Sequence, residues 1–168
     1  MTISMYAASV PLFRRSMTAL AKVLEKGAAF AEAKKIDPSV LLQSRLAPDM
    51  FPLVGQVQLV SDHAKGSLSR LAGVEAPKYA DDEKTFAELQ ARLARTQDFI
   101  GTFPAEKIDG SEEREIVLKM RAGEVRFTGL DYLLFFVIPN FLFHYATAYD
   151  ILRHNGVELG KRDFLGAR

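Results

Sequence analysis

Two polar residues capable of chemistry lie in the most apolar run of the chain, PNFLFHYATAYDILRHNG (139–156). Asn140 and His144 are four residues apart, so in a helix they lie on the same face, in line with Leu133, Val137 and Ala148. A buried amide or imidazole without a partner costs roughly 1–3 kcal/mol. The two side chains must therefore be hydrogen-bonded, hydrated or bound to a ligand.

His63 is the second imidazole that could contribute to such a site. It lies about thirteen residues into a predicted helix, and His144 lies about fourteen into the last one, so at a rise of roughly 1.5 Å per residue both are near mid-depth. Helical proteins build metal and ligand sites from inward side chains on facing helices. His63, Asn140 and His144 are thus a candidate site.

Two other interpretations of these residues are open. The three side chains can form a structural hydrogen-bond network, with or without a trapped water, that fixes how two helices align. They can also line a metal-free ligand pocket. His154 suits a structural role in the last helical turn, and Asp62 and Asp150 are expected on solvated faces.

Four long helical segments must position the candidate site. Apolar residues recur every three or four positions in each of them. The pattern predicts helices over about 9–34, from Asp49 as N-cap to a stop at Gly73, from Asp81 or Asp82 to about Phe103, and from about Leu130 to Asn155. A short connector helix follows Asp37. Pro139 should kink the last helix and free the carbonyl of Phe135.

A change of period from 3.6 to 2 predicts a β-hairpin before the last helix. In EREIVLKMRAGEVRFTG, residues 116–120 alternate and residues 125–127 follow a turn at Ala122 and Gly123. This register pairs Met120 with Val125 and Leu118 with Phe127. We expect an all-α four-helix bundle with this small hairpin, forming one domain over residues 1–168.

The composition limits the classes of function. Lys plus Arg number 22 and Asp plus Glu 21, so no broad cationic surface is available for nucleic acid. The absence of Cys excludes disulfides and thiolate sites, and it suits a cytoplasmic location. The apolar runs predict neither secretion nor a membrane span. No phosphate loop, nucleophile motif or paired inward carboxylates occur.

Three stretches resemble a family of domains of unknown function in the DinB/YfiT-like superfamily of proposed metalloenzymes. They are RLAPDMFPLVGQVQLVSDHAKGSLSRLAGV, DDEKTFAELQARLARTQDFI and GLDYLLFFVIPNFLFHYATAYDILRHNGVELGKRDFLG, in which RLAPDM and PNFxFH are the most specific words. The resemblance covers nearly the whole chain. It implies a DinB-like four-helix bundle in up-down-down-up order.

The resemblance also implies a divalent metal, nickel or zinc, held by one His of the second helix and an H-x-x-x-H pair of the last. His63 and His144 match two of these ligands, and Asn140 replaces the third. An amide oxygen is a harder ligand than imidazole and suits calcium or magnesium better. The implied activity is thiol-dependent transfer or hydrolysis on a small molecule. The alternative is a non-catalytic bundle that binds a small ligand or self-associates as a homodimer.

Overall fold

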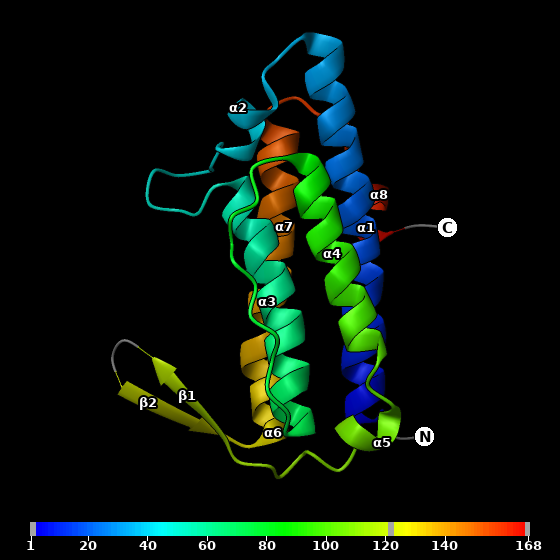
Figure 1. Ribbon diagram of the computed structural model, residues 1–168, viewed down its shortest axis with the longest axis vertical. Helices are drawn as coiled ribbons and strands as arrows, with labels where there is room; N and C mark the ends of the chain where they lie inside the picture. The colour runs from blue at the N-terminus through cyan, green and yellow to red at the C-terminus, as the bar shows by residue number, and fades with distance from the viewer. Residues whose placement is uncertain (1–2, 121–122, 167–168) are drawn as a thin grey trace.

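The computed structural model describes residues 3–120 and 123–166, and most of these residues are helical. Four long helical segments and a hairpin make up the architecture (Figure 1). The elements are α1 (Met5–Lys34), α2 (Pro38–Leu42), α3 (Leu53–Ala72), α4 (Phe86–Gly101), α5 (Ala105–Ile108), β1 (Ile116–Met120), β2 (Gly123–Phe127), α6 (Gly129–Asp131), the π-helix η1 (Tyr132–Val137), α7 (Ile138–His154) and α8 (Lys161–Leu165).

Local capping residues determine where the helices begin and end, and some of these positions differ from the boundaries that the apolar pattern predicted. Helix α1 begins at Met5, four residues before the predicted start, because the hydroxyl of Ser4 accepts the amide proton of Ala7. Helix α3 begins after Pro52, so the predicted N-cap at Asp49 was wrong. Its predicted stop at Gly73 is confirmed, since Gly73 has the left-handed conformation with φ 70°.

Helix α4 begins at Phe86, later than the acidic residues predicted to start it. Thr85 and Glu88 form a reciprocal capping box, in which Thr85 Oγ1 accepts from the Glu88 amide and Glu88 accepts from the Thr85 amide. Asp81 and Asp82 therefore lie in the preceding connection. Asp81 has a φ of 55° and turns its carboxylate toward α4.

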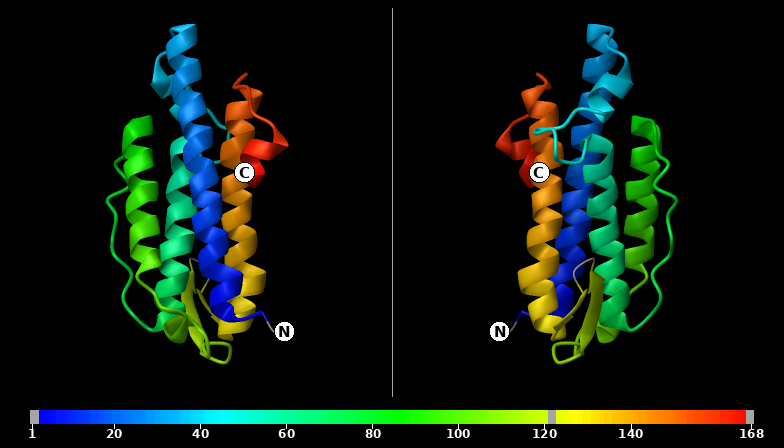
Figure 2. Two further views of the ribbon diagram at one scale, coloured as in Figure 1. Left: turned by 90° about the vertical axis from the view of Figure 1, so that its right-hand side faces the viewer. Right: turned by 90° about the vertical axis from the view of Figure 1, so that its left-hand side faces the viewer.

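The long helices lie side by side along the length of the molecule (Figures 1 and 2). Helix α1 and the α6–η1–α7 rod run in one direction, and α3 and α4 both run in the other. Helix α3 packs against α7 and α4, and α1 packs against α4 and α7. Because α3 and α4 are parallel, residues 73–85 return along the whole length of α3 before α4 starts. The fully buried core includes Leu20, Val60, Leu89 and Phe141.

The predicted hairpin is present, but its register differs by two residues. Strands β1 and β2 pair Met120 with Gly123, Leu118 with Val125 and Ile116 with Phe127. Gly123, which was predicted in the turn, is the first residue of β2. Ala122, also predicted in the turn, lies outside the described residues. A shift of two preserves the face on which each side chain lies.

The last long helix contains a π-helical segment immediately before Pro139. In η1 the amide of Ile138 donates to the carbonyl of Leu133, five residues earlier. Pro139 has no amide proton and cannot continue the α-helical pattern, so the wider turns accommodate it at the start of α7. The predicted disturbance thus takes the form of a π-helix, which adds one residue to the turn.

The 26-residue stretch Gly129–His154 is long and apolar enough to cross a membrane by length and composition. Its most apolar window has a mean hydropathy of 1.2, and 33% of that window is buried. Core helices of water-soluble domains satisfy the same criteria. The exposed side chains include Phe135 and Phe143, which form an apolar outer face on this helix.

Candidate functional site

The structure brings His63 of α3 and His144 of α7 together. Their ring centroids are 5.4 Å apart and the ring planes are inclined by 15°. Both rings are half-buried, on the seam where α3 packs against α7. The prediction that the two residues lie at the same depth of facing helices is therefore confirmed.

Gln56, one turn before Val60 on α3, orients the ring of His144. The amide nitrogen of Gln56 donates to the carbonyl of Phe51 at 3.0 Å, so its Oε1 atom is the acceptor that faces His144 Nδ1 at 2.7 Å. A neutral imidazole carries one proton, and this contact places it on Nδ1. Nε2 of His144 then keeps its lone pair, as a metal ligand or a general base requires.

Both imidazoles are held in the neutral form. Burial is the main cause that lowers the pKa of His63 to about 4, and the neighbouring His144 and the cation of Arg70 lower it further, against the carboxylate of Asp62. Burial also lowers the pKa of His144. A protonated pair would place two positive charges side by side in a poorly solvated seam. At neutral pH the site therefore presents two uncharged nitrogen donors.

Asn140 is half-buried one helical turn before His144, and its amide is engaged locally. Its Nδ2 atom donates to the carbonyl of Phe136 at 2.6 Å, across the junction between η1 and α7. The Oδ1 atom is thus the part of Asn140 that remains for another donor or a cation. This hydrogen bond satisfies a backbone carbonyl where the helix changes from π to α geometry, so Asn140 has a structural role as well.

The apolar stripe predicted to contain Asn140 and His144 takes a different course. Because η1 adds a residue to the turn, the buried positions after Val137 are Phe141 and Tyr145. Asn140 and His144 lie at the edge of this stripe and not in its centre. Their half-buried placement leaves them within reach of solvent, which a site needs and a core network does not.

The donor set fits a weak metal site better than a tight one. Two neutral imidazoles and one amide oxygen can hold a divalent cation, with water completing the shell. In residues 3–120 and 123–166, no group of three or more His, Cys, Asp or Glu side chains is placed to hold a metal ion. The family resemblance predicts a third strong ligand at position 140, where this chain has Asn.

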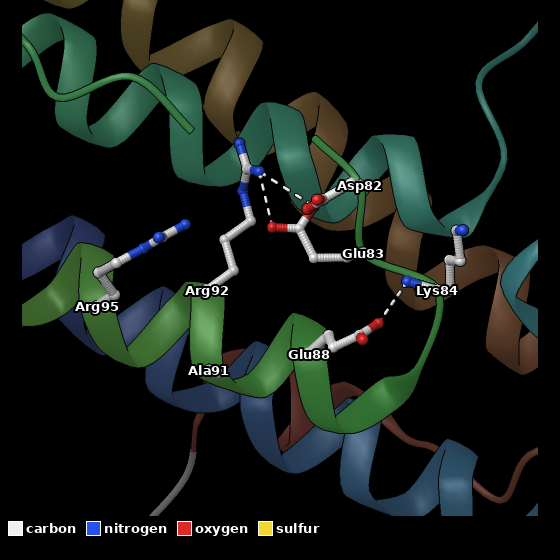
Figure 3. A pocket seen from close by; sticks show the side chains of 7 residues that line it. All are labelled: Asp82, Glu83, Lys84, Glu88, Ala91, Arg92 and Arg95. Atoms are coloured by element: carbon white, nitrogen blue, oxygen red, sulfur yellow. Dashed lines mark hydrogen bonds and ion pairs between the residues drawn. The ribbon is translucent and has the colours of Figure 1, made fainter. Parts of the chain in front are cut away.

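A second polar cluster, centred on Arg92 of α4, was missed by the sequence reasoning. Arg92 is 1% exposed. Its guanidinium donates to Glu83 at 3.0 and 3.2 Å and to Asp62 at 2.8 Å, and it lies 2.6 Å from Asp81. Figure 3 shows Arg92 reaching from α4 to Glu83 in the returning connection. Asp62 was predicted to be solvated, and this was wrong because it pairs with Arg92 and with Lys65.

The hollow beside Arg92 belongs to this structural cluster. It has a volume of about 480 Å³, and its lining includes Glu88 and Arg95 (Figure 3). Glu88 is used in the helix cap, and Arg95 lies over the ring of Tyr79 at 3.6 Å. Hydrogen bonds from Gln58 and Arg92 hold the pKa of Glu83 below its usual value, although burial opposes them. The cluster fastens the returning connection to α3 and α4.

The sequence contains signals for Arg92 and its acidic partners, although they were not predicted, but none for Gln56. Arg92 is three residues after Leu89 and four before Thr96, both of which are buried, so its position on the inner face was readable. The acidic run DDE at 81–83 supplied the partners. Gln56 offered no comparable signal, because nothing in its spacing indicates the tertiary contact with His144.

Comparisons with known proteins agree with the fold. Residues 5–165 match the family model described as "Domain of unknown function (DUF1993)". The crystal structure of a DinB family member protein from Shewanella denitrificans is similar at a TM-score of 0.89 and 41% identity, over 97% of this chain and 92% of that one. No curated protein matches. The chain belongs to the DUF1993 family and has a DinB-like fold.

Proposed function

We propose that this protein is a DinB-like four-helix bundle, in up-down-down-up order, that binds a divalent metal weakly through His63 and His144. One observation carries the proposal: Nδ1 of His144 lies 2.7 Å from Oε1 of Gln56, and the ring centroid of His144 lies 5.4 Å from that of the second imidazole, His63. An acceptor that fixes the other ring nitrogen is the usual outer contact of a metal-binding histidine.

The residues of the chain have separate roles in this proposal. His63 and His144 supply nitrogen donors, Asn140 Oδ1 supplies a weak third donor, and Gln56 sets the orientation of His144. A cation bound there would act as a Lewis acid toward water or a thiol. The reaction class that follows is thiol-dependent transfer or hydrolysis of a small molecule. Asn140 favours harder cations than nickel or zinc, so the affinity for those two metals should be low.

A second candidate is a non-catalytic bundle in which the three side chains form a structural network or contact a small ligand. The bonds from His144 to Gln56 and from Asn140 to Phe136 favour it, because they satisfy these polar groups within the protein. In that case the loss of His144 would affect stability alone.

The decisive experiment is metal analysis of protein purified without an affinity tag, followed by titration with nickel, zinc and magnesium. Parent protein, His144→Ala and Asn140→His are compared, with His154→Ala as the matched control for loss of an exposed imidazole. The metal proposal expects weak binding that disappears in His144→Ala, persists in His154→Ala and tightens for nickel or zinc in Asn140→His. No binding in the parent and none in Asn140→His would favour the structural alternative.

We further propose a cytoplasmic protein with no nucleic-acid or membrane partner, and a homodimer through the outer face of the Gly129–His154 stretch. The C-terminal segment over residues 156–166, which contains three glycines, is a poorer contact than that face. Its helix α8 packs on α1, Lys26 pairs with Asp163 at 2.7 Å, and the Tyr145 hydroxyl donates to the carbonyl of Phe164. Phe135 is 75% exposed and Phe143 is 54% exposed, so the helix offers more apolar area to a partner.

A further inference from the structure

Arg70, in the last turn of α3, follows His63 on the same helix, and its guanidinium lies over Gly66. A Cβ atom placed on Gly66 would meet Arg70 Nη1 at 2.9 Å, closer than real Cβ atoms come to their neighbours. Glycine at position 66 therefore lets the guanidinium fold back along the surface of α3. This direction is toward His63, whose pKa the cation of Arg70 lowers.

The folded guanidinium ends at the hydroxyl of Tyr132. Arg70 Nη1 donates to Tyr132 Oη at 3.2 Å, and the ring of Tyr132 is almost fully buried. Both contacts involve the same terminal nitrogen, Nη1, so Gly66 and Tyr132 together define the position of the guanidinium group. A surface arginine that sampled many conformations would need neither the space left by the missing Cβ of Gly66 nor a hydrogen bond to the buried phenol of Tyr132.

A row of aromatic rings connects this end to the histidines. The ring of Tyr132 stacks on Phe136 at 5.8 Å, Phe136 meets His63 edge-on at 6.3 Å, and His63 is 5.4 Å from His144. Phe127 of the hairpin packs on Tyr132 and Phe136 from outside, at 6.0 and 5.5 Å. The row makes one continuous apolar edge, with Arg70 at one end and Gln56 near the other.

Arg70 has no acidic partner in the part of the chain that the structure describes, since no Asp or Glu oxygen lies within ion-pair distance of it. The buried Arg92, by contrast, has three. An oriented guanidinium with free donors, beside uncharged bases and aromatic rings, is the arrangement that binds a carboxylate or phosphate through paired hydrogen bonds.

We propose that Arg70, supported by Gly66 and Tyr132, anchors an oxyanion of the small molecule that occupies the His63–His144 site. The ligand class is an anionic compound with a flat apolar portion, its carboxylate or phosphate on Arg70 and the remainder along the aromatic row. This inference rests on the proposed function only for the location of the site. It requires no bound metal.

The test uses benzoate as the probe and benzamide as its neutral counterpart of the same shape. Metal-free protein, dialysed out of chelator into chloride buffer at constant ionic strength, is titrated while its backbone and arginine side-chain NMR signals are followed. Inorganic phosphate is titrated separately to distinguish the two oxyanions. The variants are Arg70→Gln, Gly66→Ala and the matched control Arg153→Gln, which removes an exposed arginine from α7.

We expect benzoate to shift the signals of His63 and Arg70, and benzamide to bind at least about tenfold more weakly, since a charge-assisted bond is lost. Arg70→Gln should weaken benzoate by a similar factor and Arg153→Gln should not. Gly66→Ala should also weaken benzoate binding. The charge of Arg70 remains in this variant, but the added methyl group occupies the space in which the guanidinium lies. A merely structural arginine at the helix end would change the melting temperature without distinguishing benzoate from benzamide.

Three results would overturn the inference: no benzoate or phosphate binding up to about 50 mM, equal binding by Arg70→Gln, or equal binding of benzamide. Nickel titration of Arg70→Gln keeps the two proposals separate. If that variant binds nickel as the parent does but not benzoate, both hold. If the parent binds benzoate but no metal, only the metal proposal fails.

Discussion

The imidazoles of His63 and His144 lie nearly parallel, 5.4 Å apart, on helices α3 and α7. The residues are 81 positions apart in the sequence (144 − 63). Only the packing of α3 against α7 makes them neighbours. Burial lowers the pKa of His63, and the neighbouring His144 lowers it further. The seam should therefore make the stability of the molecule depend on pH.

His63 should make stability depend on pH between about 4 and 6.5. Its pKa in the folded state is about 4, below its value of 6.5 in the unfolded chain, so the unfolded state binds more protons in this interval. The free energy of unfolding should decrease as pH falls from 6.5 toward 4, by on the order of 2 kcal/mol. Urea unfolding at a series of pH values measures it. His63→Gln should flatten the curve, and His154→Gln should leave it unchanged.

Replacing Gln56 by Leu should affect both stability and metal binding. It removes the acceptor of the His144 Nδ1 proton, and a half-buried donor without a partner costs about 1–3 kcal/mol. Loss of the orienting contact should also weaken any metal affinity by about 10- to 100-fold. Chemical denaturation and metal titration test the two effects. If Gln56→Leu binds metal as the parent does, Gln56 does not orient His144 as a ligand.

Arg92→Met should be the most destabilising of the charge-removing substitutions. Three carboxylates would remain around an uncharged side chain, and breaking a buried ion pair in this way costs about 3–5 kcal/mol. The connection over residues 73–85 should become sensitive to proteases while α3 and α7 remain helical. Arg95→Met is the control: it removes an exposed cation over Tyr79 and should cost less than about 1 kcal/mol. Equal effects of the two variants would contradict the role of Arg92.

The apolar outer face of the last long helix should mediate dimer formation. Phe135→Ser combined with Phe143→Ser should convert a dimer of the 18.7 kDa chain to a monomer, with little change in stability because both rings are exposed. Light scattering after gel filtration measures the mass. Val40→Ser, at an equally exposed position on α2, should leave the dimer intact. A parent protein that is monomeric at high concentration would exclude this interface.

Much of the fold was predictable because it depends on local periodicity. The stripe of α3 through Leu53, Val60 and Leu68 is buried as expected, and the change of period located the hairpin. The start of α4 was not predicted, because Asp81 and Asp82 resemble N-caps locally. The Asp81 carboxylate instead lies 2.6 Å from Arg92, which only tertiary packing brings to it.

The site was predictable in its residues but not in its chemistry. His63 and His144 do meet on the α3–α7 seam. The sequence could not show that Gln56 contacts Nδ1 of His144 or that Asn140 donates to the Phe136 carbonyl. Both depend on contacts of a particular rotamer. The predicted central position of Asn140 and His144 failed because a regular period of 3.6 does not describe a helix with a π-helical segment.

The π-helical segment also determines where the chain can lose a residue without losing the site. Removal of one residue between Tyr132 and Val137 would restore a regular helix without rotating α7, because the six residues of η1 turn the chain about as far as one residue fewer does in an α-helix. Phe141 and Tyr145 would stay in the interior, and Asn140 and His144 would keep their places on the seam. A deletion within α7 itself would instead rotate the residues that follow it by about 100°.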